Sequence, residues 1–416
     1  MRDREYSAFM LLNAPGFGAK SIYYVYDRLK KLGLTVNDLF EAGQKQLSEF
    51  LPELGKGKFS RAKPDSLCSL DNDKLYSSYQ KLKHEHVHII GLDDERYPES
   101  VIQRLGENTP PVLFCKGNLQ LLNADGISIV GSRDVSDFAV LMTKRIANRL
   151  ADGGFNVTSG FAKGVDTSAH IGALEAGGTT TMVLSYGFNQ LSIKGEIKEQ
   201  NWEQNTLFIS QFMPYEKFSG QNAMGRNKLV CALSRAVIII SSGPERDGGS
   251  GKMSGTFDAG LTALKYKIPL FVLNPELLKP NPPQGNYDLI KLGGIPLSNG
   301  NELVQHLNKI SRLSASLHKE EKETQYEILT QPNVVFEPLS EQYQKHPTDI
   351  KDKILNAFNG KPLSVQEILI AAELDWTPKK LALYLKKFPE LEIVKSGRNT
   401  LYKRKQGSQQ GQTTLF

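Results

Sequence analysis

Short apolar runs alternate with amphipathic stretches across the middle of this chain. Each run is apolar on both faces, which is typical of a strand buried in a parallel sheet. The stretches between the runs repeat apolar residues at helical spacing, as Phe138, Leu141, Ile146 and Leu150 do. This alternation predicts an α/β fold built on an extended Rossmann-like, doubly wound parallel sheet. The predicted strands are 127–130, 155–158, 180–184, 207–209, 236–240 and 270–273, with a further strand at 112–114.

The first 80 residues have a helical pattern instead. Amphipathic stretches at 8–12 and 22–32 are separated by a turn that contains Pro15, Gly16 and Gly18. Such a turn between short helices resembles a helix-hairpin-helix, whose hairpin amides can bind a DNA backbone. A plain interhelical connection, in which glycine supplies the backbone angles, fits the pattern better because short turns of this composition are common. We expect a helical module, SAM-like or helix-hairpin-helix-like, over residues 1–80 and the sheet domain over 81–308.

The C-terminal part has a third pattern. Residues 309–347 are polar and predict a linker. Apolar periodicity returns over 348–405, where three helical stretches precede two strands that flank a basic turn at 395–399. Three helices and a basic hairpin predict a winged helix. Residues 406–416 predict a disordered tail.

Positive charge is concentrated in the predicted winged helix. The whole chain of 416 residues has a formal net charge of +6. Residues 351–405 hold 12 Lys and Arg against 6 Asp and Glu, an excess as large as that of the whole chain. A basic module of this kind favours contact with nucleic acid or another acidic surface.

The sequence offers no sign of a membrane or an oxidising compartment. No apolar run approaches the roughly 20 residues that a membrane span needs, and the first residues lead into an amphipathic stretch rather than a signal peptide. Cys68, Cys115 and Cys231 are isolated, which predicts buried, unreactive thiols rather than a disulfide or a metal site. We therefore expect a cytoplasmic protein.

Three histidines alternate just before an apolar pair. His84, His86 and His88 would share one face of a strand, and a metal site there is conceivable. No partner ligand follows at suitable spacing, so a half-exposed edge strand fits the pattern better.

Two glycine-containing turns carry the candidate chemistry. Gly131-Ser132-Arg133 follows the first predicted strand, and Ser159-Gly160 follows the second, with Lys163 and Gly164 shortly after. Turns after parallel strands lie at one edge of a sheet, where free amides at helix starts favour anions. Arg133 and Lys163 add full positive charge, so the sequence predicts a phosphate-binding site.

The order of motifs over about 97–275 resembles one known family. The motifs include Ile129-Val130-Gly131-Ser132-Arg133, the run from Ser159 to His170, Ala173 to Thr180, Arg226-Asn227-Lys228 and Ala232 to Ala236. In their order and spacing the chain is similar to the DNA-processing proteins called DprA or Smf.

The resemblance implies a function. Proteins of this family bind single-stranded DNA, pair as homodimers through their sheet domains and load a RecA-type recombinase in recombination or natural transformation. It implies no catalytic residue, metal or cofactor. Carried over by position, the DNA-binding residues are Gly131, Ser132, Arg133, Ser159, Gly160, Lys163, Gly164, Arg226, Asn227 and Lys228.

The chain departs from the family pattern at several places. Gln211 stands at a family acidic position, and Ser241-Ser242 replaces the usual Glu-Ala after the fifth predicted strand. The loop over 243–252 is longer and richer in glycine than usual, and 188–207 lacks the expected Tyr-Pro. These differences affect the expected pocket contacts and the recombinase interface.

An enzyme is the alternative. Nucleotide phosphoribohydrolases of a related fold carry a glycine-rich loop that 248–256 loosely echoes, and Glu175 or Asp166 could act as the acid. Asp166 also fits a helix N-cap, with His170 one turn later in a buried capping network. The altered loop further suggests a nucleotide-sensing defence protein.

The last five residues form a possible peptide motif. Gln412, Leu415 and Phe416 match the Gln-x-x-Leu-Phe pattern of peptides that bind the bacterial sliding clamp. A chance match is the competing explanation, because so short a motif arises often.

Overall fold

The chain divides into two units, residues 1–336 and 337–416. The computed structural model describes residues 3–200, 202–246, 251, 253–298 and 303 of the first unit. In the second unit it describes residues 354, 358, 362–371, 381, 385, 391–396 and 399–404. The predicted linker, 309–347, and the predicted tail, 406–416, lie outside the described residues.

A nine-stranded sheet forms the centre of the first unit, with strand order β1-β2-β6-β5-β4-β3-β7-β8-β9. Seven neighbouring strands, β6 to β9 in that order, are parallel, while β1 and β2 pair antiparallel at one edge. The strands are β1 (His88–Gly91), β2 (Val112–Gly117), β3 (Gly126–Val130), β4 (Asn156–Gly160), β5 (Thr180–Leu184), β6 (Thr206–Ser210), β7 (Ser234–Ile239), β8 (Leu270–Leu273) and β9 (Ile295–Leu297).

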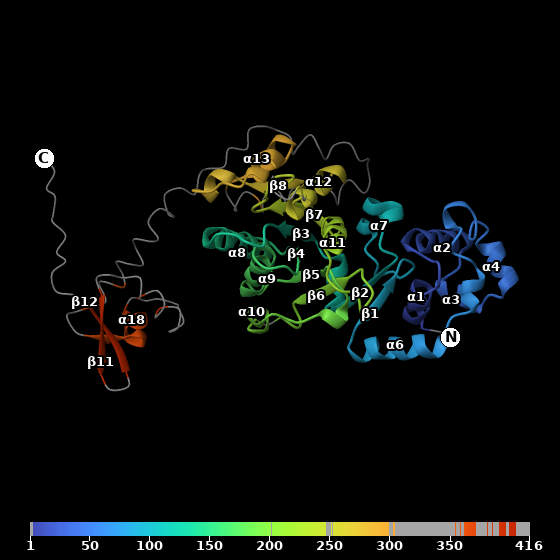
Figure 1. Ribbon diagram of the computed structural model, residues 1–416, viewed down its shortest axis with the longest axis horizontal. Helices are drawn as coiled ribbons and strands as arrows, with labels where there is room; N and C mark the ends of the chain where they lie inside the picture. The colour runs from blue at the N-terminus through green and yellow to red at the C-terminus, as the bar shows by residue number, and fades with distance from the viewer. Residues whose placement is uncertain are drawn as a thin grey trace. The chain divides into compact units, whose positions relative to one another are not determined.

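The chain winds outward from β3 in both directions. It first runs from β3 to β6 on one side, then returns to place β7, β8 and β9 on the other side (Figure 1). The point where the order reverses lies between β3 and β7, and ligands of open α/β sheets bind outside the carboxyl ends of the strands at such a point.

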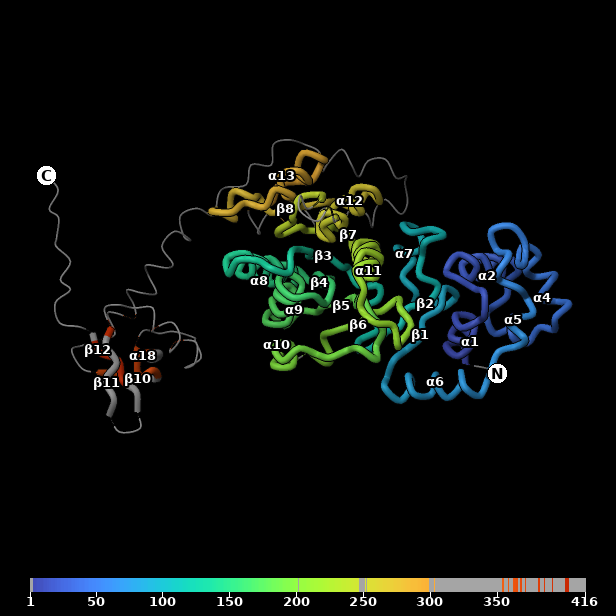
Figure 2. The backbone as a smooth tube through the Cα atoms, viewed as in Figure 1, coloured from blue at the N-terminus to red at the C-terminus, as the bar shows by residue number. Residues whose placement is uncertain are grey.

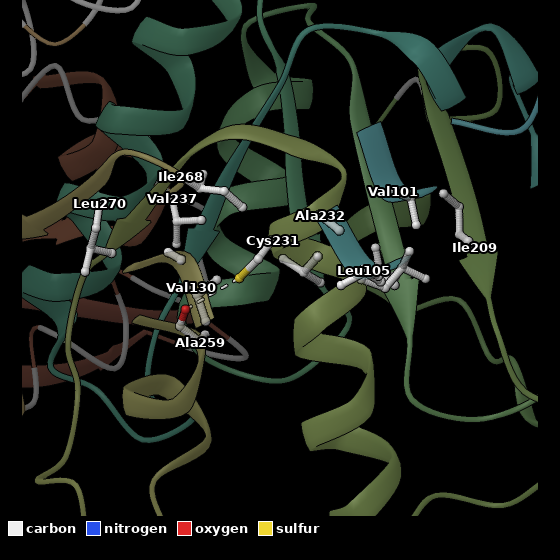
Figure 3. Packing of buried hydrophobic residues seen from close by; sticks show 14 of the residues in the cluster. Val101, Leu105, Val130, Ile209, Cys231, Ala232, Val237, Ala259, Ile268 and Leu270 are labelled. Atoms are coloured by element: carbon white, nitrogen blue, oxygen red, sulfur yellow. Dashed lines mark hydrogen bonds between the residues drawn. The ribbon is translucent and has the colours of Figure 1, made fainter. Parts of the chain in front are cut away.

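Helices cover both faces of the sheet. Side chains alternate along each strand, so Ile127 and Ile129 of β3 pack towards α8 and α9, while Val130 packs towards α11 and α12. Figure 3 shows the second layer, in which Cys231 lies between Val130 and Ala232. The helices of this region are α7 (Glu99–Leu105), α8 (Asp137–Asp152), α9 (Val165–Glu175), α10 (Gly195–Lys198), α11 (Gly220–Ala232), α12 (Gly255–Lys265) and α13 (Gln284–Lys291).

The doubly wound sheet is confirmed, with three differences from the sequence prediction. The antiparallel pair β1 and β2 makes the sheet mixed rather than parallel throughout. Strand β9 has only three residues, and the sequence prediction missed it. Strand β4 extends to Gly160, so the predicted turn at Ser159-Gly160 is wrong and the turn lies at 161–164.

Small helices precede the sheet. Helix α1 packs its apolar face against β1 and β2, where Phe9, Ile89 and Phe114 share one apolar cluster. Helix α6 then leads from these helices back to β1 (Figure 2). The helices are α1 (Arg4–Leu12), α2 (Ala19–Leu32), α3 (Val36–Glu41), α4 (Gln44–Phe50), α5 (Asp65–Cys68) and α6 (Asn72–His84).

The three histidines do not share a strand face. His84 ends α6, and His86 lies in the following turn with φ 57°, so only His88 belongs to β1. Strand β1 is an edge strand, as expected. The described residues contain no group of three or more His, Cys, Asp or Glu that could hold a metal ion.

The cysteine prediction is correct for two thiols and wrong for one. Cys115 and Cys231 are buried, and Cys68 is exposed. Burial raises the pKa of the Cys231 thiol to about 12, which keeps it protonated. Over the residues described, no helix is both long and apolar enough to cross a bilayer.

The second unit contains a three-stranded sheet. Strands β11 (Leu391–Ser396) and β12 (Asn399–Arg404) form an antiparallel hairpin, and β10 (Leu363–Ser364) pairs with β12 just before α18 (Val365–Ala371). The hairpin lies where the sequence predicted a basic wing. Most of the other two predicted helices lies outside the described residues.

Candidate nucleic-acid interface

Three turns meet at the carboxyl edge of the sheet. The backbone N–H and the hydroxyl of Ser132 both donate to the carbonyl of Ser241, each at 2.9 Å. The N–H of Val165, the first residue of α9, donates to the carbonyl of Ser132 at 3.3 Å. The turns after β3, β4 and β7 are therefore joined at the point where the strand order reverses.

Two glycines of these turns allow the close approach. Gly164 has φ 74°, and a Cβ there would lie 2.5 Å from the carbonyl oxygen of Arg133. A Cβ at Gly131 would lie 2.5 Å from a methyl group of Val165. Only glycine fits both positions, so these residues bring the β3 and β4 turns together.

A buried ion pair supports the turn after β4. Arg226 Nη1 lies 3.4 Å from Asp166 Oδ2, and the two side chains are 6% and 5% exposed. Asp166 is the second residue of α9 and Gly164 is the N-cap, so the predicted N-cap role of Asp166 is wrong. The Arg226 guanidinium therefore points into the protein. It pairs with the first turn of α9 and is not exposed at the surface.

Other expected ligands are also turned inward. The Ser159 hydroxyl is buried and donates to the Ile129 carbonyl at 2.5 Å. The side-chain amide of Asn227 donates to the carbonyl of Gly255 at 2.8 Å. Helix α11 begins at Gly220, so Arg226 and Asn227 lie in its interior.

Of the basic residues that the sequence analysis assigned to DNA binding, Arg133, Lys163 and Lys228 are exposed. Arg133 and Lys163 belong to the two joined turns, since the backbone of Arg133 lies against Gly164. Lys228 projects from α11 near Asp258 of α12. Burial raises the pKa of the Asp258 carboxyl group, and the positive charge of Lys228 partly offsets that rise.

An exposed aromatic side chain accompanies Arg133. The Arg133 Cζ atom lies 5.3 Å from the centre of the Phe218 ring, and Phe218 is 51% exposed. Tyr215, in the same loop, is 67% exposed. The sequence analysis missed both, although the three aromatic residues between β6 and α11, Phe212, Tyr215 and Phe218, were a usable signal.

Backbone hydrogen bonds fix the loop that carries these aromatics. The N–H of Gly187 donates to the carbonyl of Glu216, and the N–H of Asn189 donates to the carbonyl of Pro214, each at 2.8 Å. Ser219 caps α11 directly after Phe218. The ring of Phe218 is thus presented to solvent by an ordered segment.

Lys194 stabilises the turn after β4 through three hydrogen bonds. Its ammonium donates to the carbonyls of Phe161 and Ala162 and to the Thr167 hydroxyl, at 3.1, 2.9 and 2.6 Å. Burial lowers the pKa of Lys194, partly offset by the charge of Asp166. The sequence prediction did not include this residue.

His170 completes the buried network. Its Nε2 lies 2.7 Å from the carbonyl of Gly160, and its Nδ1 lies 2.7 Å from the Thr180 hydroxyl. A carbonyl only accepts, so Nε2 carries the proton of the neutral ring. Burial lowers the pKa of His170 to about 3, and the nearby charges of Lys194 and Arg226 act in the same direction.

The carboxylates of the enzyme hypothesis lie apart. Asp166 lies in the first turn of α9 and is buried against Arg226, whereas Glu175 ends the same helix and pairs with Lys144 at 2.6 Å. Part of the glycine-rich loop, 247–250, lies outside the described residues. The described residues therefore bring no two candidate acids together.

Comparison with known proteins gives a consistent result. The family described as DNA recombination-mediator protein A matches residues 88–308. Protein Smf of Escherichia coli (strain K12) is 27% identical over 58% of this chain and 62% of its own length, which is less than two thirds of that relative. DNA processing protein DprA of Streptococcus pneumoniae (strain ATCC BAA-255 / R6) is 28% identical over 53% of this chain and 78% of its own length.

A solved structure shows the same fold. The X-ray structure of DNA processing protein A (DprA) from Streptococcus pneumoniae aligns with a TM-score of 0.57 at 22% identity and covers 73% of this chain and 98% of that chain. The matched family region contains β1 to β9 and every turn of the carboxyl edge described above. This chain belongs to the DNA recombination-mediator protein A family.

Proposed function

We propose that this chain binds single-stranded DNA at the carboxyl edge of its sheet, as a mediator of DNA recombination. The observation that supports this most directly is the placement of Arg133. Its guanidinium lies over the exposed ring of Phe218 and belongs to the same joined pair of turns as the exposed Lys163. A cation beside an exposed ring suits a strand that offers phosphates and unpaired bases together.

Each group has a distinct role in this proposal. Arg133 and Lys163 neutralise phosphates, which supplies the salt-dependent part of the affinity. Phe218 and Tyr215 offer faces on which bases stack, and a base must be unpaired to reach them. The combination favours single strands over duplexes.

The inward-facing residues support the site indirectly. Ser159, Gly160, Arg226 and Asn227 hold the turns and α11 in place through buried contacts. We propose a positioning role for them in place of the direct DNA contacts that the family resemblance implied. Gly131, Ser132 and Gly164 shape the turn backbone, and Lys228 contributes exposed charge on α11.

A titration of the full chain with oligonucleotides tests the proposal. Fluorescence anisotropy should show tighter binding to a single-stranded 20-mer than to the matching duplex, with affinity that falls steeply as salt rises. Equal affinity for both forms, or binding that salt leaves unchanged, would contradict it.

The proposed function also includes protein partners and a cytoplasmic location. Family membership supports loading of a RecA-type recombinase and pairing of two copies through the sheet domains, in the cytoplasm. The basic hairpin β11–β12 supports a winged helix that adds nucleic-acid contacts. The tail residues Gln412, Leu415 and Phe416 are proposed to bind a sliding clamp and lie outside the described residues.

A further inference from the structure

A second cationic surface lies on the N-terminal helices. The segment 55–63 carries four exposed basic side chains, Lys56, Lys58, Arg61 and Lys63. The nearest acidic residues in sequence, Glu53 and Asp65, lie just outside the two ends of this run. Such a density of one charge on a short loop is the usual footprint of a surface that binds a polyanion.

The loop has a defined shape. Gly55 and Gly57 have φ 75° and 47°, and the N–H of Gly55 donates to the carbonyl of Ala62 at 2.8 Å, which closes the loop. Phe59 is buried beneath it and stacks on Tyr24 with ring centres 5.0 Å apart. The aromatic ring therefore anchors the loop from inside while the basic side chains face outward.

This loop is continuous with the turn between α1 and α2. Gly16 has φ 81°, and a Cβ there would lie 2.0 Å from the carbonyl oxygen of Arg61, so the two turns are packed together. Lys20 at the start of α2 and Lys58 of the loop approach the same carboxylate, Glu107, at 2.9 and 3.7 Å. Lys20, Lys56, Lys58, Arg61 and Lys63 thus form one surface, the N-terminal cationic surface.

The amides of the α1–α2 turn are partly occupied. The N–H of Gly18 donates to the Ser21 hydroxyl at 2.9 Å, and the N–H of Phe17 donates to the carbonyl of Ala14 at 3.1 Å. These two amides are used within the protein, whereas Lys56, Arg61 and Lys63 are exposed and have no ion pair among the described residues, so their side chains are available to phosphate.

We propose that the N-terminal cationic surface binds the phosphate backbone of duplex DNA as a second site, formed by elements outside the carboxyl edge. Phe59 is buried, so the loop presents charge without offering that ring to unpaired bases. Contacts of this type position a duplex without reading its sequence. A chain with both sites holds a duplex next to a single strand, and this inference does not depend on the single-strand site.

Neutralising three cations tests the inference in the full chain. The variant Lys56→Gln, Arg61→Gln, Lys63→Gln removes three charges for which the structure shows no ion pair among the described residues. Anisotropy titrations of a 20-base-pair duplex at several salt concentrations should show affinity at least ~10-fold lower at low salt. The plot of log Kobs against log salt should be less steep by about 2 to 3, because each duplex phosphate contact contributes about 0.9.

A matched variant distinguishes the effect of this surface from the effect of a lower net charge. Lys45→Gln, Lys74→Gln, Lys81→Gln removes the same charge from exposed lysines of α4 and α6 in the same part of the chain and should leave the salt slope unchanged. Equal slopes for both variants, or a wild-type slope in the first, would overturn the proposal. The variant Arg133→Ala, measured in parallel on single strands, reports on the carboxyl-edge site alone.

Discussion

The guanidinium of Arg226 fills the space beside Gly160 where a side chain would otherwise stand. A Cβ built on Gly160 would lie 1.2 Å from Arg226 Nη1 and 2.5 Å from Asp166 Oδ2. The buried pair between α9 and α11 therefore exists only because position 160, at the end of β4, has no side chain. Gly160 and Arg226 are 66 positions apart in the sequence, and together they support the turn after β4 beneath the candidate site.

Replacing Gly160 with alanine should break this arrangement. The methyl group displaces Arg226 and leaves Asp166 buried without its partner, which costs about 3–5 kcal/mol of unfolding free energy. Thermal or denaturant unfolding of Gly160→Ala measures the loss. Gly195→Ala is the control, because a Cβ there meets nothing within 4 Å. A wild-type unfolding midpoint for Gly160→Ala would show that Arg226 does not need this space.

Removing one exposed cation should weaken single-strand binding without unfolding the protein. Arg133→Ala and Lys163→Ala should each make the slope of log Kobs against log salt less steep by about 0.7 per lost phosphate contact. Lys291→Ala, in the last turn of α13 before β9, is the control with the same loss of charge. If all three variants bind alike, the two turns do not contact DNA.

Removing the Phe218 ring should lower the affinity without changing its salt dependence, unlike removal of a cation. Phe218→Ala should lower single-strand affinity by roughly 5- to 150-fold, since stacking of one base is worth about 1–3 kcal/mol. The salt slope should stay as in the wild type because no charge is lost, and Phe218→Trp should retain binding. A changed slope in Phe218→Ala would mean that the ring acts by positioning Arg133.

The buried His170 predicts a pH dependence of stability. Its pKa of about 3 in the folded chain lies below its ordinary value of 6.5. Between these values the unfolded chain binds the extra proton, so stability falls as pH falls from 6.5 towards 3. The loss is about 1.4 kcal/mol per pH unit.

Denaturant unfolding of the wild type and of His170→Asn over this pH range isolates the contribution. The stability advantage of the wild type should shrink with acidification, because the variant lacks the titrating group. A constant difference between the two proteins from pH 6.5 to pH 4 would contradict the buried neutral imidazole.

Deleting the last five residues, 412–416, should abolish capture of the chain by an immobilised sliding clamp. Leu415 and Phe416 would fill an apolar pocket on the clamp, so replacing both with alanine should have the same effect. Single-strand affinity should be unaffected in either variant. Undiminished capture would show that the terminal match arose by chance.

The order of apolar runs was sufficient to predict the sheet because parallel strands buried on both faces have a simple signature. Strand β9 escaped prediction because Ile295–Leu297 is too short to form a pattern. The end of β4 was misplaced because Ser159 and Gly160 are residues typical of turns. Their burial in the sheet depends on Ile129 and Arg226, which are distant in sequence.

The sequence by itself determined the doubly wound sheet, the family and the two turns that carry Arg133 and Lys163, because these features depend on local pattern and on motif order. Only the tertiary structure decided which residues face solvent. Arg226 and Arg133 are the same residue type, yet one is buried against Asp166 and the other lies over Phe218. Burial and pairing arise from segments that meet only when the chain folds, so local sequence does not encode that difference.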